Sequence, residues 1–385
     1  MIFSVLKRRV KKSKWGILFL ALAGFQVVVA LGFLIPAFIH VREIHDGNGL
    51  NNDLADYSGK SFKVSGECLM FIIFELWRLW LAIDGVVRLN SRTIYASASF
   101  TILSFLFSIM LVAESVNWIK VINNSRSAIE HPEYNNLRLI NQHLQIALSV
   151  SIFLLIFPTF WVANRITKDF GWDVYKKIGS SIKIQEMYID LQWLSLMLKI
   201  DIFFEFLSYL LLFVYQKFNT PFEIASRLYM SPDDGLIVFI VLLLPSFILC
   251  RLSIARESHF LMSIFIFVQV AFLANTIVTA VVTFAVARAW YAYMMYIAGV
   301  LVAAIATMGL AIKCQLNFNK GLKDHVQWHP WKRNLSIKRK SVNYNTVHAT
   351  EEYFGANGRR DSIPIDDDDS SMHIDMLPEP PRTKP

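Results

Sequence analysis

Six ionisable residues interrupt two long apolar stretches of this chain, and their types and spacing could carry chemistry. They are Glu75, Arg78 and Asp84 in one stretch, and Lys199, Asp201 and Glu205 in the other. A charged group at the centre of a membrane helix costs about 2.5–3.5 kcal/mol on insertion scales, so each charge there needs a physical reason. One reason is functional, namely an ion or proton path or a polar substrate pocket. The other is structural pairing between helices, which the local balance of opposite charges favours.

The spacing within each stretch predicts which of these charges can meet. Glu75 and Arg78 are three residues apart, so they share a helix face and can pair within one helix. Asp201 and Glu205 are four apart and share a face, whereas Lys199 projects nearly opposite to them.

Lys199 therefore needs an acidic partner on another helix. We expect that partner to be Glu75, with Asp84 as the second choice.

Eight apolar stretches must position these residues. Crossing about 30 Å of hydrocarbon takes about 20 helical residues, and the backbone there can form hydrogen bonds only within the protein. The sequence therefore predicts an all-α polytopic integral membrane protein with about eight transmembrane helices. The spans together make a transmembrane domain of residues 16–312. We expect them near 16–38, 68–87, 94–119, 144–166, 191–215, 236–250, 260–286 and 290–312. Pro245 interrupts the short sixth span.

Composition agrees with a membrane protein. Hydrophobic residues make up 55% of the chain and charged residues 18%, against roughly 45–50% and 25% in soluble domains. The formal net charge of +8 could indicate a nucleic-acid partner in a soluble protein. Here the basic residues cluster beside the apolar stretches, so they indicate orientation in the lipid bilayer and not nucleic-acid binding.

Positive charge places both termini on the cytoplasmic side. The arm 1–15 and the juxtamembrane segment 313–340 are both basic, and eight spans put them on the same face, as the positive-inside rule requires. Asn123 begins an N-x-S tripeptide in a loop on the opposite face, so it is a candidate for glycosylation.

The remaining tail, 341–385, is polar and segregates its charges, and we expect it to be disordered. It contains Arg-Arg-Asp-Ser, which makes Ser362 a candidate phosphorylation site. No nucleotide-binding, hydrolase or zinc-protease motif occurs in the sequence, which favours a protein without cofactor, metal or catalytic activity.

The cytoplasmic loop 165–190 carries the strongest local pattern. Its motif has the form W-x-V-Y-K-K-I-G and comprises Trp172, Val174, Tyr175, Lys176, Lys177 and Gly179. The motif could anchor the loop at the lipid headgroups or bind a protein partner. A K-x-D-x-F-F run follows at 199–204, and an N-F-x-x-G-L run at 317–322. Together these runs resemble a family of uncharacterised multi-spanning Golgi apparatus membrane proteins from fungi.

That resemblance implies membrane integration and a Golgi or related endomembrane location, and it implies no particular activity. Two classes of function remain open from the sequence. We favour a non-catalytic trafficking or membrane-organising protein that works through the loop 165–190 and the tail. The alternative is a transporter or channel that uses the charged residues of the second and fifth spans. A solvent-filled path to Asp201 would favour transport, and a closed bundle would favour the organiser.

Overall fold

The computed structural model describes residues 14–47, 55–123, 132–178, 182–218, 232–286 and 291–318, and nearly all of them are helical. The helices belong to one compact unit, Met1–Trp328, and each overlaps one expected span. They are α2 (Lys14–Gly47), α3 (Ala55–Arg88), α4 (Ser91–Asn123), α6 (Pro132–Ile178), α7 (Ile182–Phe218), α8 (Pro232–Arg256), α9 (His259–Val286) and α10 (Tyr291–Leu316). The predicted all-α polytopic architecture is confirmed.

Judged on the residues whose side chains the structure describes, six of these helices are long and apolar enough to cross a membrane, and α3 and α7 are the exceptions. Both exceptions carry the charged residues singled out above. Their packing explains why they tolerate charge, because α3 contacts α2, α4 and α7, and α7 contacts α3, α4, α8 and α10. Each is surrounded largely by protein instead of lipid, so its polar side chains find partners within the bundle.

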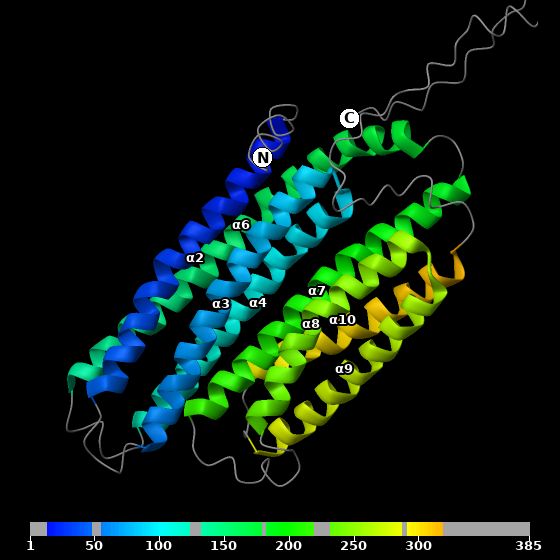
Figure 1. Cartoon of the computed structure of the whole chain (residues 1–385). Helices are drawn as coiled ribbons and strands as arrows, with labels where there is room; N and C mark the ends of the chain where they lie inside the picture. Colours follow the sequence, from blue (N-terminus) through cyan, green and yellow to red (C-terminus); the bar gives the residue numbers. More distant parts are fainter. Residues whose placement is uncertain are drawn as a thin grey trace, which may run out of the picture. The chain divides into compact units, whose positions relative to one another are not determined.

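The helices pack in two groups that lie side by side in Figure 1. In the first group, α2 packs on α3 and α6, and α4 packs on α3 and α6. In the second group, α7 packs on α8 and α10, and α9 packs on α8 and α10. The two groups meet where α3 and α4 contact α7 and where α4 contacts α10.

Aromatic side chains fill the junction between the groups. The rings of Trp77 on α3 and Phe203 on α7 stack with centroids 4.0 Å apart and an interplanar angle of 8°. Phe74 contributes edge-on contacts to Phe100 and Phe107 on α4. Such ring pairs add about 0.5–1.5 kcal/mol each to the burial of apolar area, so this junction fixes the register of α3 against α7.

Two tight turns set the ends of helices on one side of the bundle. Leu89 follows α3 with φ 54°, and Glu257 follows α8 with φ 48°. The next backbone N–H in each turn donates back into the helix, from Asn90 to Gly85 O at 3.0 Å and from Ser258 to Ser253 O at 3.2 Å. This left-handed ending reverses the chain within two residues.

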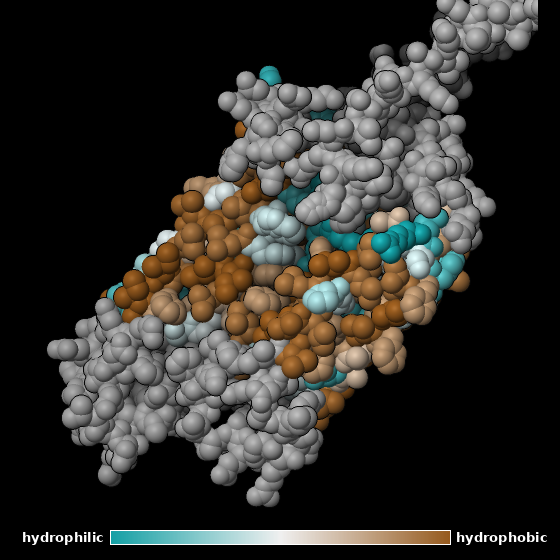
Figure 2. Space-filling model, in the orientation of Figure 1, coloured by the Kyte–Doolittle hydropathy of each residue, from teal (hydrophilic) through white to brown (hydrophobic). Residues whose placement is uncertain are grey.

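The outer surface of the helices is apolar over much of its area. Exposed hydrophobic side chains include Phe267 (76% exposed) on α9, Val302 (71%) on α10 and Phe157 (64%) on α6. Figure 2 shows hydrophobic residues covering the middle of the helices on one face. An apolar surface of this extent is stable only in contact with lipid or another apolar surface, as expected for a membrane-embedded bundle.

Candidate functional site: the charges of α3 and α7

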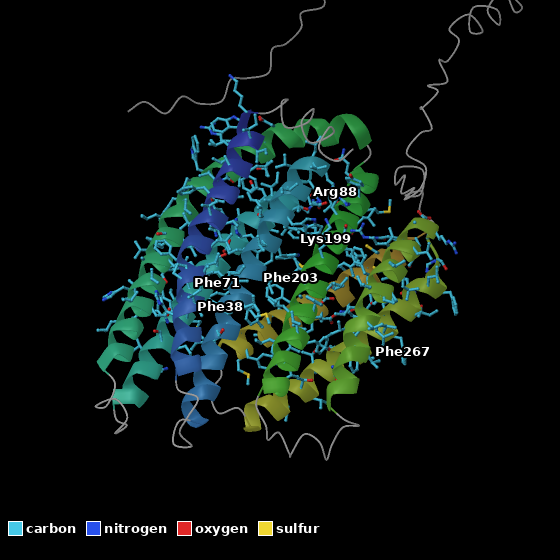
Figure 3. The ribbon with its side chains drawn as sticks, turned by 60° about the vertical axis from the view of Figure 1, so that its left-hand side comes forward. Phe38, Phe71, Arg88, Lys199, Phe203 and Phe267 are labelled. Carbon is cyan, nitrogen blue, oxygen red and sulfur yellow. The ribbon has the colours of Figure 1, made fainter. Side chains whose placement is uncertain are left out.

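Lys199 forms an ion pair with Asp84 at the junction between α3 and α7. Its Nζ lies 2.5 Å from Asp84 Oδ2, and the two side chains are 4% and 10% exposed. Arg88, one turn further along α3, binds the other carboxylate oxygen at 2.6 Å and is 47% exposed. Asp84 therefore neutralises one buried and one half-exposed cation, and Figure 3 shows Lys199 and Arg88 toward the same end of the bundle.

This pairing corrects the expectation that Glu75 would be the partner of Lys199. The second choice, Asp84, is the partner in the structure. The register set by the stack of Trp77 on Phe203 explains the choice. Lys199 lies one helical turn from Phe203, and Asp84 lies two turns from Trp77, both toward the same end of the bundle.

Glu75 is instead held within the first group of helices. Its carboxylate accepts hydrogen bonds from Arg78 Nε at 2.9 Å and from Gln26 Nε2 at 3.1 Å. Arg78 also donates to the carbonyl oxygen of Ala23 on α2 at 3.2 Å. The predicted pairing of Glu75 with Arg78 is confirmed, and together with Gln26 the two residues tie α3 to α2.

Asp201 and Glu205 are the two remaining members of the six charged residues predicted from the sequence, and each is 1% exposed. Gln269 on α9 donates to Asp201 Oδ2 at 2.5 Å, and Thr307 on α10 lies beside the same carboxylate. Asp201 Oδ1 and Glu205 Oε1 are buried without a hydrogen-bond partner. Unlike Asp84 and Glu75, these two residues have no cation among their described contacts.

Sequence reasoning missed the polar groups that continue along α7 from this carboxylate pair. Tyr209, one turn beyond Glu205, accepts a hydrogen bond from Asn275 Nδ2 at 3.0 Å and lies 3.3 Å from Thr276 Oγ1. Spacings of four residues from Asp201 to Glu205 to Tyr209 place all three on one face of α7. Extending that i, i+4 pattern beyond the charged residues would have found Tyr209.

A second polar cluster, also missed, lies near the end of the bundle that contains Arg88. Arg92 on α4 donates to Gln192 on α7, and its guanidinium lies 5.5 Å from the ring centroid of Trp193. Lys313 on α10 pairs with Asp190 on α7 at 2.8 Å. These contacts join three helices close to the expected cytoplasmic surface.

A third feature is a small cavity of about 10 Å³ beside Glu67 on α3. The cavity is lined otherwise by Phe71, Phe107, Met110, Leu111 and Tyr296. Its size is about that of a single water molecule.

The motif of the segment 165–190 lies at the C-terminal end of α6. The span expected for α6 ends at residue 166, yet the helix continues to Ile178, directly before Gly179. Most of the segment 165–190 between the two spans is therefore helical, and the motif residues that belong to α6 are Trp172, Val174, Tyr175, Lys176 and Lys177.

Several other predicted sites are untested by the structure. Asn123 is the last residue of α4, while Ser362, the arm 1–13 and the segment beyond 318 lie outside the described residues. Within the described ranges, no group of three or more His, Cys, Asp or Glu side chains is placed to hold a metal ion.

Comparison with known proteins adds one relative. Over 289 residues, which cover 66% of this chain and 76% of the relative, the sequence is 23% identical to a UPF0658 Golgi apparatus membrane protein of Schizosaccharomyces pombe. This chain is a distant homologue of that Golgi membrane protein. The resemblance to fungal Golgi membrane proteins and the predicted integral location in Golgi or related endomembranes are thereby confirmed. No protein-family model matches the chain, and no solved structure matches it.

Proposed function

We propose that this protein is a non-catalytic trafficking or membrane-organising protein that binds partners through a helical projection on its cytoplasmic side. The observation that carries the proposal is the length of α6. This helix continues for twelve residues, 167–178, beyond the expected end of its membrane span at residue 166. At 1.5 Å per residue the extension is about 18 Å long, and it carries the W-x-V-Y-K-K motif.

The chemistry of the motif suits a docking surface for an acidic protein partner. Trp172 and Tyr175 are three residues apart, and Lys176 follows one turn after Trp172, a spacing that brings side chains together on one face of a helix. Aromatic residues next to basic residues are typical of interaction sites, because the rings supply contact area and the amines supply charge complementarity.

The buried charges support an organiser more than a transporter. Lys199 and Asp84 neutralise each other between α7 and α3, Glu75 and Arg78 neutralise each other within α3, and all four side chains are at most 10% exposed. Glu205 and Asp201 are closed to solvent in this conformation. By the criterion stated from the sequence, a closed bundle of this kind favours the organiser.

A transporter is the second candidate function, and one observation favours it. Asp201 and Glu205 carry buried carboxylate oxygens without hydrogen-bond partners, at the centre of the second helix group. In another conformation such a pair could bind a transported cation or proton.

Photo-crosslinking in native membranes tests the docking proposal. A photoreactive phenylalanine analogue replaces Tyr175 in the full-length chain, and the same analogue replaces Phe157 on the lipid-facing surface of α6 as the matched control. We expect discrete protein adducts at 175 that disappear when Lys176→Glu and Lys177→Glu are added, and lipid adducts alone at 157. Lipid adducts alone at 175 would contradict a docking role for the motif.

A flux assay separates the two functions. Purified protein in sealed proteoliposomes should leave the internal pH and Na⁺ content unchanged under an imposed gradient. A flux that Asp201→Asn abolishes would favour the transporter.

A further inference from the structure

The Asp201–Glu205 pair poses a problem of charge neutrality inside the second helix group. Both side chains are 1% exposed, and two ionised carboxylates four residues apart would repel each other in a medium that screens charge poorly. Lys199 is the nearest cation in sequence, but it is already paired with Asp84 on the opposite face of α7.

The helices packed against α7 bring no compensating cation to this pair. From α9, residues 260–286 contain no titratable side chain, and the contact is the Gln269 amide. From α10 the contact is the Thr307 hydroxyl, while Lys313 pairs with Asp190. The remaining titratable or charged groups of these helices within the described side chains are Cys250, Arg251 and Arg256 of α8, His259 of α9, Glu67, Cys68, Glu75, Arg78, Asp84 and Arg88 of α3, Arg92, Tyr95 and Glu114 of α4, Glu186, Tyr188 and Tyr209 of α7, and Tyr293, Tyr296 and Cys314 of α10.

Hydrogen bonding distinguishes the two carboxylates from each other. Asp201 Oδ2 accepts from Gln269, and Thr307, which is fully buried, lies beside the same carboxylate with its hydroxyl oxygen making no hydrogen bond. Glu205 Oε1 and Asp201 Oδ1 each lack a donor. One added proton would remove one charge and give one of these two oxygens a donor for the other.

We propose that Asp201 and Glu205 form a proton-binding site inside the bundle, with the proton carried by Glu205 and donated in a hydrogen bond to the Asp201 carboxylate. Asp201 keeps the negative charge, because Gln269 stabilises its other oxygen and Thr307 is placed to donate to it. The ligand is a proton, and its uptake joins the two unpartnered oxygens without any metal ion. The site is independent of the docking function proposed for the end of α6.

Infrared difference spectroscopy on the full-length purified protein tests this assignment, because a protonated carboxyl and a carboxylate absorb at different frequencies. At neutral pH, the spectrum of wild type minus Glu205→Gln should contain one protonated-carboxyl band, which shifts in D₂O. Wild type minus Asp201→Asn should contain carboxylate bands. Asp190→Asn is the matched control. Asp190 is paired with Lys313, so the spectrum of wild type minus Asp190→Asn should contain carboxylate bands only.

Two results would overturn the proposal. The first is a Glu205→Gln difference spectrum with carboxylate bands alone at neutral pH, because both groups would then be ionised. The second is a change in these bands when NaCl replaces choline chloride, because a metal cation would then occupy the site. If the variants fail to fold, the wild-type protein alone still decides, since its protonated-carboxyl band must disappear as the pH is raised to alkaline values.

Discussion

Asp84 and Lys199 should contribute unequally to stability, although they form one ion pair. The reason is Arg88, which binds the second oxygen of Asp84 at 2.6 Å. When Lys199→Met removes the ammonium, Asp84 keeps a cation. When Asp84→Asn removes the carboxylate, Lys199, with a side chain only 4% exposed, is left without a counter-charge.

The magnitudes follow from this asymmetry. Leaving one buried partner of an ion pair without its counter-charge costs about 3–5 kcal/mol, and the amide oxygen introduced at position 84 still accepts a hydrogen bond, so we expect about 3 kcal/mol for Asp84→Asn. Lys199→Met should cost about 1.5 kcal/mol, the value for losing a hydrogen bond to a charged group. The double variant should cost about 2 kcal/mol or less, because it removes both buried charges. The two single costs then exceed the cost of the double variant by at least about 2.5 kcal/mol, which is the coupling energy between the two positions.

The measurement compares the free energies of unfolding of the wild type, the two single variants and the double variant. Each protein is unfolded in mixed micelles of a mild detergent and increasing SDS, and tryptophan fluorescence follows the transition. Trp80 lies 5.9 Å from the Lys199 ammonium and reports directly on the junction. Two results would refute the reasoning. One is a Lys199→Met variant at least as destabilised as Asp84→Asn, and the other is a double variant as damaged as the sum of the single ones.

Three further predictions concern the helix contacts and the tail. Arg78→Met should lower the free energy of unfolding by about 3–5 kcal/mol, because Glu75 is then buried beside Gln26 without a cation; SDS titration measures the loss, and a loss below about 1 kcal/mol would contradict the assigned pair. Gly299→Ala should cost about 1–3 kcal/mol, because its Cβ would lie 3.0 Å from the Phe204 ring, and Phe204→Leu should recover part of that loss. Truncation after residue 340 should leave the melting temperature in detergent unchanged, since a polar tail buries little apolar surface; a lower melting temperature would show that the tail packs on the bundle.

The sequence predicted the helices better than it predicted their contacts. Length and apolarity located all eight helices, because the bilayer sets the required length. The pairing of Glu75 with Arg78 was also predictable, since a spacing of three depends on one helix alone. The partner of Lys199 was not predictable in this way, because it depends on the axial register of α3 against α7.

Neighbouring helices account for the other differences. Gln269 and Thr307 are ordinary residues of apolar helices, and nothing in their local sequence shows that they meet Asp201. Apolarity alone does not predict that α6 continues through 170–178, because this segment is too polar for a membrane span. That composition excludes hydrocarbon, but it does not exclude a helix in water or at the interface.

The central claim is an eight-helix membrane protein whose α6 extension reaches the cytoplasm. Cysteine labelling in sealed microsomes tests it most directly, because Cys68, Cys250 and Cys314 are all buried and leave a low background. A membrane-impermeant maleimide should label Lys176→Cys from the outside, and it should label Asn219→Cys, in the loop on the opposite face, only after the membrane is permeabilised. Protection of position 176, or labelling of both positions in intact vesicles, would contradict this topology and the docking function that depends on it.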